Sequence, residues 1–89
     1  MTAIVKIKLM PSSVDENFKN LKWAVKKIVE NGGGENINFE EEPIAFGLKA
    51  LIIFFLWSEE KELESLEKEL GEIEEVNSVE VLDIRKALG

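Results

Sequence analysis

The sequence contains no cysteine and no histidine among its 89 residues. Without cysteine, the chain has no disulfide framework, no thiolate metal site, no cysteine nucleophile and no haem attachment. Without histidine, it lacks the commonest general base, the commonest metal ligand and any phosphohistidine chemistry. These absences favour a binding role over catalysis.

Positive charge is also scarce. The 11 lysines and arginines are outnumbered by 18 acidic residues, which gives a formal net charge of −7 and a pI near 4.6. General nucleic-acid binding needs an excess of lysine and arginine on one face to neutralise phosphates. We therefore expect no direct nucleic-acid partner.

Long apolar runs are missing as well. The longest, Ala50 to Trp57, has eight residues, whereas a helix that spans a bilayer needs about 20. The N-terminus does not resemble a signal peptide, because Lys6 and Lys8 interrupt its apolar stretch. We expect a soluble, cytoplasmic protein with no membrane partner, and the length predicts a single domain over residues 1–89.

The first half of the chain shows one strand pattern followed by one helix pattern. Residues 3–10 alternate between two faces and predict a half-buried strand. Ser13 and Glu16 fit a capping box. Apolar residues at three- and four-residue spacing then predict a helix to about Asn31, which the three glycines at 32–34 end.

The second half repeats this pattern with an extra strand. Residues 35–41 predict a weak strand, and residues 48–57 predict the strongest strand of the chain. Ser58 is predicted to cap a helix that follows directly, with a buried stripe of Leu63, Leu66, Leu70 and Ile73. A turn at 77–78 and a last strand over 79–84 complete the chain.

The predicted order, β-α-β-β-α-β, is typical of the α+β ferredoxin-like fold. Right-handed crossovers place both helices on one face of an antiparallel four-stranded sheet, with the first and third strands in the middle. The third strand is apolar on both faces, although a sheet with one solvated face should alternate. Three explanations stay open: long neighbouring side chains cover it, another protein docks there, or the chain self-associates.

Several side chains are predicted to lie on the surface. Trp23 lies nearly opposite the apolar stripe of its helix, and we expect it to pack on Lys26 or Lys27. Residues 59–75 hold nine glutamates and two lysines, which is typical of a solvated helix face. The three glutamates at 40–42 do not have the spacing of a calcium loop, so we predict no metal site and no cofactor.

Several functions that this fold hosts require residues that the sequence lacks. A copper-chaperone domain needs paired cysteines, and a nucleoside diphosphate kinase needs a histidine nucleophile. An acylphosphatase-like enzyme needs a cation between the first strand and the first helix, where residues 11–13 are Pro-Ser-Ser. The third strand lacks the basic motif of RNA-recognition domains. Elimination favours a binding module, and we predict that the protein is not an enzyme.

One segment is more specific than these patterns. Residues 40–51, EEEPIAFGLKAL, resemble the signature of the archaeal elongation factor 1-beta family, whose members exchange nucleotide on the GTPase elongation factor 1-alpha. Met10-Pro11, the acidic second helix, Val79-Glu80-Val81 and Asp83-Ile84-Arg85 are also similar to that family. The resemblance covers nearly the whole chain.

The resemblance implies that the protein binds the GDP form of elongation factor 1-alpha, loosens the nucleotide and lets GTP enter. Its candidate contacts in the signature segment are Pro43, Phe46, Gly47 and Lys49. A positive φ at Gly47 would present Phe46 at a bend. The alternative for Phe46 is a core position at the end of the sheet.

The C-terminus departs from the eukaryotic relatives. They place a penultimate lysine near the Mg²⁺ site of the GTPase, where its cation competes with the metal for ligands. Here the penultimate residue is Leu88, so the resemblance offers Arg85 or Lys86 as the substitute.

Two other functions stay open. The first is a small ferredoxin-like regulatory or assembly domain that dimerises through the sheet and binds a small ligand. The second is a single-stranded RNA binder that uses the aromatic residues of the sheet. The oligomeric state also stays open, with a monomer as the starting hypothesis.

Overall fold

A computed structural model describes residues 2–12 and 18–86 of the chain. Its elements are β1 (Thr2–Pro11), α1 (Phe18–Asn31), β2 (Glu35–Pro43), the 3-10 turn η1 (Ala45–Gly47), β3 (Lys49–Ser58), α2 (Leu63–Gly71) and β4 (Val76–Lys86). The predicted order of helices and strands is confirmed. Among the described residues, no helix is long and apolar enough to cross a membrane.

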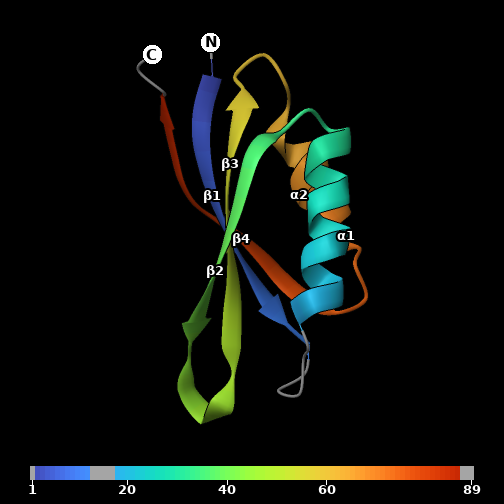
Figure 1. Ribbon diagram of the computed structural model, residues 1–89, viewed down its shortest axis with the longest axis vertical. Helices are drawn as coiled ribbons and strands as arrows, with labels where there is room; N and C mark the ends of the chain where they lie inside the picture. The colour runs from blue at the N-terminus through green and yellow to red at the C-terminus, as the bar shows by residue number, and fades with distance from the viewer. Residues whose placement is uncertain (1, 13–17, 87–89) are drawn as a thin grey trace.

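The strands form one antiparallel sheet in the order β2-β3-β1-β4. The pairing of β1 with β3 begins with Thr2 opposite Ser58 and ends with Leu9 opposite Leu51, so these two strands occupy the middle as predicted. Both helices cover the same face of the sheet (Figure 1). The arrangement is the α+β ferredoxin-like fold.

The core lies between the sheet and the two helices. The alternation of β1 turns Val5, Ile7 and Leu9 toward the helices, where each is at most 1% exposed. The neighbouring strand and the helices complete the core with Phe18, Leu21, Val25, Val29, Leu51, Ile53, Phe55, Trp57, Leu66 and Leu70. Among the described residues no polar or charged side chain is buried, so apolar burial is the main source of stability.

The other face of β3 is covered by side chains of β1. Ala50 and Ile52 are buried there, at 0% and 3% exposure. Lys6 lies opposite Phe54 in the register, with its Nζ 5.4 Å from the centre of that ring. Lysine stems cover apolar surface while their charged ends stay in water. The geometry therefore favours the first of the three explanations for the apolar strand.

Helix α1 ends at the glycines, as predicted. Gly33 has a φ of +102°, a conformation that residues with a Cβ rarely adopt. The N–H of Gly33 donates to the carbonyl of Glu30 at 3.0 Å, and that of Gly34 donates to the carbonyl of Val29 at 2.8 Å. These bonds form a Schellman motif that satisfies the last carbonyls of the helix.

The prediction that Ser58 caps the second helix is wrong. Ser58 is the last residue of β3, held opposite Thr2, and its Oγ accepts a hydrogen bond from the N–H of Glu60 at 3.3 Å. The hydroxyl therefore closes a turn, and α2 begins at Leu63, with Glu62 at the N-cap. Pairing with β1 extends β3 to Ser58, so α2 begins further along the chain than predicted.

The predicted turn at residues 77–78 is also wrong. Asn77 and Ser78 belong to β4, next to a register shift against β1 between Met10 and Pro11. A bulge on an edge strand absorbs the polar residues without ending the strand. The predicted capping box of Ser13 and Glu16 lies outside the described residues.

Replacing Gly33 with alanine is expected to destabilise the fold by about 1–2 kcal/mol, because a left-handed backbone conformation is unfavourable for a residue that has a Cβ. Gly71 is the matched control, since its φ is not positive and an added Cβ would meet Val79 Cγ2 at an ordinary 3.7 Å. Gly71→Ala should be neutral or stabilising by up to about 1 kcal/mol. Urea unfolding measures both changes, and a Gly33→Ala midpoint at or above that of the parent would contradict the role of this cap.

Candidate functional site

The closed end of the β2–β3 hairpin carries four of the predicted contact residues. Pro43 and Lys49 form the last pair of the two strands, and Phe46 and Gly47 lie in the turn between them. All four residues are exposed. The hairpin end projects away from the helices (Figure 1), so these residues form one accessible tip.

The backbone of this tip is held in an unusual conformation. Phe46 has a φ of +62° and Gly47 a φ of +78°, which confirms the positive φ expected at Gly47. The N–H of Ile44 donates to the carbonyl of Leu48 at 2.7 Å across the turn. Glycine tolerates the left-handed region, whereas for phenylalanine it costs about 1–2 kcal/mol.

The side chain of Phe46 lies in solvent, at 96% exposure. The alternative of a core position at the end of the sheet is therefore wrong. An exposed aromatic ring on a strained backbone adds nothing to the packing of the domain. Strain of this kind gathers at functional sites, and exposed apolar groups mark contact sites, so the tip is the strongest candidate for a partner contact.

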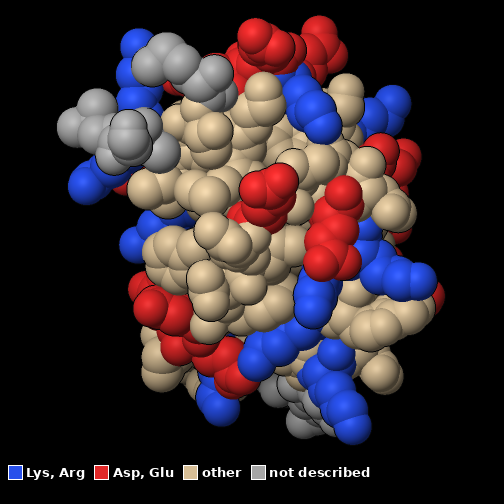
Figure 2. All heavy atoms as spheres, turned by 45° about the horizontal axis from the view of Figure 1, so that its top comes forward, with Lys and Arg blue, Asp and Glu red and all other residues tan. Residues whose placement is uncertain are grey.

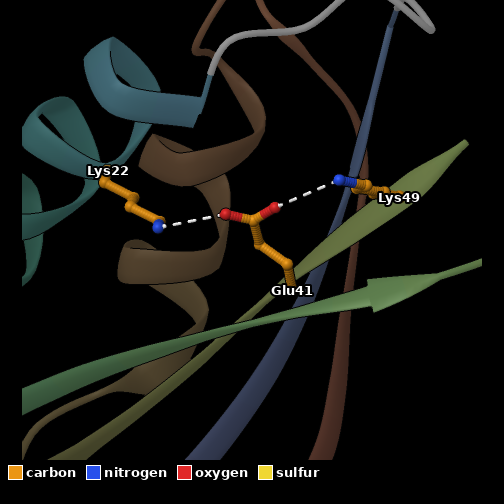
Figure 3. A network of polar contacts seen from close by, with 3 residues as sticks. All are labelled: Lys22, Glu41 and Lys49. Atoms are coloured by element: carbon orange, nitrogen blue, oxygen red, sulfur yellow. Dashed lines mark hydrogen bonds and ion pairs between the residues drawn. The ribbon is translucent and has the colours of Figure 1, made fainter.

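A network of ion pairs links the hairpin to α1. Glu41 of β2 lies between Lys22 of α1 and Lys49 of β3 (Figure 3). Its Oε2 is 3.3 Å from Lys22 Nζ, and its Oε1 is 3.8 Å from Lys49 Nζ. Each pair is half-exposed and contributes about 1 kcal/mol at most. The network nevertheless orients Lys49 beside the tip.

The three glutamates at 40–42 do not act as one cluster. Successive strand residues point to opposite faces, so Glu41 faces α1 and its lysine while Glu40 and Glu42 lie on the open face. Among the described residues, no group of three or more acidic side chains is placed to hold a metal ion. The sequence analysis did not predict that, within the described part of the chain, Glu41 alone of the three forms ion pairs with lysines. Strand alternation could have indicated this, because it places Glu41 on the face opposite to Glu40 and Glu42.

The other two predicted contact residues lie at the end of β4. The Nε of Arg85 is 2.6 Å from Oδ2 of Asp83, although the Arg85 side chain is 78% exposed. Lys86 lies opposite Ala3, and Arg85 lies opposite Ile4, so the two cations point to opposite faces of the sheet. Lys86 has no carboxylate within 4 Å among the described residues.

The structure separates the predicted contacts into two groups. Lys86 is level with Ala3 of β1 and Trp57 of β3. Lys49 lies at the other end of β3, eight residues before Trp57. At about 3.3 Å per residue, this places the groups roughly 26 Å apart. The longest dimension of the molecule is 39 Å, so the tip and the end of β4 lie near opposite ends of the sheet (Figure 1).

The open face of the sheet has a shallow hollow near the end of β4, lined by Ile4, Lys6, Phe54, Asp83 and Arg85. Its one aromatic ring, Phe54, is half-buried beneath Lys6. Acidic residues of both edge strands, among them Glu40 and Asp83, border the central lysines on this face. Lys6 therefore covers part of the Phe54 ring.

Replacing Phe46 is expected to reveal the cost of its left-handed backbone in the free energy of unfolding. Phe46→Gly removes the left-handed penalty and should be about 1 kcal/mol more stable to urea than Phe46→Ala, which keeps that penalty. The side chain is almost fully exposed, so neither variant loses core packing. Equal stability of the two variants would contradict the strained conformation.

Comparison with known proteins agrees with the fold and the signature segment. Residues 4–87 match the family model of the EF-1 guanine nucleotide exchange domain. The chain is 39% identical to elongation factor 1-beta of Methanosarcina barkeri over 80 residues, which cover 89% of this chain and 90% of the relative. It is also 39% identical to elongation factor 1-beta of Methanocaldococcus jannaschii over 88 residues, or 97% and 98% of the two chains. The chain therefore belongs to the family of EF-1 guanine nucleotide exchange domains.

Proposed function

We propose that residues 1–89 act as one exchange domain that contacts elongation factor 1-alpha at two separated places. The hairpin tip with Phe46 is the first, and the end of β4 with Lys86 is the second. The observation that carries the proposal is the near-complete exposure of Phe46 on a left-handed backbone. The activity belongs in the cytoplasm, where translation elongation takes place.

Phe46 serves as the apolar anchor. Burying a phenylalanine side chain in a pocket stabilises a complex by about 1.5–3 kcal/mol, which corresponds to roughly ten- to hundredfold in affinity. The turn already fixes the backbone that carries the ring, so binding has only to order the side chain. Pro43 and Lys49 form the last strand pair before the turn, and Lys49 adds a positive charge that Glu41 orients.

At the second contact place, the end of β4, Lys86 supplies the positive charge that acts on the nucleotide site of the GTPase. Asp83 partly neutralises Arg85, whereas Lys86 has no acidic partner in the described part of the chain. A lysine ammonium next to the GTPase nucleotide site would compete for the anionic groups that otherwise hold Mg²⁺. Of the two substitutes offered by the resemblance, the structure favours Lys86.

Exchange on this basis needs no catalytic group. Nucleotide release forms and breaks no covalent bond, so the absence of cysteine and histidine is no obstacle. The domain has only to bind the nucleotide-free GTPase more tightly than the GDP form, and linkage then weakens GDP binding by the same factor. A difference of about 3 kcal/mol would weaken it more than a hundredfold.

The alternative of a domain that dimerises through the sheet has less support. Ala50 and Ile52 are already buried on the open face within one chain, and Lys6 covers Phe54. No apolar surface at the centre of the sheet requires a second copy to cover it.

Phe46→Ala is expected to raise the concentration of this protein that half-saturates GDP release by about tenfold or more, because an anchor contact is lost. The measurement is the release of a fluorescent GDP analogue from elongation factor 1-alpha at increasing concentrations of the domain. Phe46→Tyr keeps an aromatic ring and is the matched control, with an expected change within about threefold. Unchanged half-saturation for Phe46→Ala would rule out the tip as a contact.

Lys86→Ala is expected to lower the maximal rate of GDP release by about tenfold, with little change in half-saturation, because its charge acts at the nucleotide site. Lys86→Arg keeps the charge and should retain most of the rate. Arg85→Ala distinguishes the two candidates, since Asp83 already pairs with this residue. A rate loss in Arg85→Ala with full activity in Lys86→Ala would reverse the assignment.

A further inference from the structure

The outer face of α1 presents an exposed tryptophan surrounded by lysines. Trp23 is 64% exposed, and Lys27 Nζ lies 4.6 Å from the centre of its ring, which confirms the predicted packing on a lysine. Lys19 and Lys26, four residues before and three after, lie on the same helix face. The buried face of α1 is formed by Phe18, Leu21, Val25 and Val29. The fold itself therefore makes no use of the indole.

A recess with complementary properties lies beside α2. Its volume is about 300 Å³, and its lining includes Trp57 and Leu66, which are 5% and 2% exposed. The exposed residues Glu62 and Glu69 also line it. Lys61 also lines it, and its Nζ donates to the carbonyl of Gly32 at 2.8 Å. The recess therefore combines buried apolar side chains with exposed carboxylates and one lysine, whose Nζ lies 5.8 Å from the centre of the Trp57 ring.

The two helices carry opposite charge. Helix α1 contains four lysines and one glutamate, while α2 contains three glutamates and one lysine. Basic side chains gather on the side of the molecule where α1 lies (Figure 2). The chain therefore presents both an aromatic group with cations and a receptacle with anions on its helical side.

We propose that the helix layer binds a second copy of this chain, with Trp23 of each copy seated in the recess of the other. Because both helices lie on one face of the sheet (Figure 1), a two-fold axis sets α1 of each copy against α2 of the other. Lys26 and Lys27 then meet Glu62 and Glu69. The open sheet face and the hairpin tip remain outside this interface, so the inference does not depend on the proposed function.

The association is expected to be weak. The contact involves one helix pair in each direction and lacks the wide apolar surface of an obligate dimer. Each copy also carries a net charge of −7, which opposes association except where opposite charges meet within the screening distance of about 8 Å. We expect a dissociation constant between about 1 μM and 1 mM.

Sedimentation equilibrium of the full chain tests the interface directly. The mass should rise from monomer to dimer as the concentration approaches about 1 mM. Trp23→Ala should raise the dissociation constant at least about tenfold, as expected for an interface tryptophan. Phe46→Ala removes a different exposed aromatic ring and should leave the mass unchanged from the parent. A chain that stays monomeric at about 1 mM, or assembles beyond a dimer, overturns the proposal.

A charge exchange identifies the faces that meet. The double variant Lys26→Glu/Lys27→Glu and the double variant Glu62→Lys/Glu69→Lys should each fail to dimerise alone. Mixed in equal amounts, the two variants should pair with each other. In the mixed dimer, one contact joins the introduced glutamates to the introduced lysines, and the other joins the original lysines to the original glutamates. All four positions are exposed, so the fold is retained, as circular dichroism checks. Failure of the mixture to pair while both variants remain folded overturns the two-fold arrangement.

Discussion

The antiparallel pairing of β1 with β3 is the interaction on which the rest of the structure depends. Eight residue pairs join the two strands, and both strands present apolar side chains to the helix layer without a buried polar group among the described residues. On the opposite side, Lys6 of β1 lies over the ring of Phe54 in β3. The helix-facing side of this pair is therefore buried within one chain, whereas Ile4 on its open side stays 44% exposed.

The same pairing sets the shape of the candidate site. The partner residues of β1 end at Leu51 of β3, whereas β2 continues to pair with β3 as far as Lys49. The hairpin therefore extends beyond the support of the central strand, with a link to α1 through Glu41 and Lys22. Its tip and the end of β4 are connected by continuous strands. The separation of the tip from the end of β4 is therefore set by the register of the sheet.

The sequence predicted the elements whose signal is local and repeated. Alternation in β1, the helical spacing in α1 and the glycines at 32–34 led to correct positions because each segment buries one regular face. Ser58 defeats a local prediction because its hydroxyl suits a helix cap and a turn equally. Pairing with Thr2, a residue 56 positions away in the chain, decides between the two. The contact residues came from resemblance. Their separation into two groups depends on the register of all four strands, and the exposure of Phe46 depends on its backbone angle, neither of which a local pattern encodes.

The two tryptophans have opposite environments, and this gives the molecule two intrinsic optical reporters. Trp57 is buried against Phe55, edge to face at 5.8 Å, and its indole N–H donates to the carbonyl of Lys61. Trp23 stands in water under a lysine ammonium. Emission from an indole in an apolar site lies at shorter wavelength than emission from a hydrated one. The shorter-wavelength emission of Trp57 therefore reports whether the core is intact. The longer-wavelength emission of Trp23 is accessible to a soluble quencher and reports whether a partner covers α1.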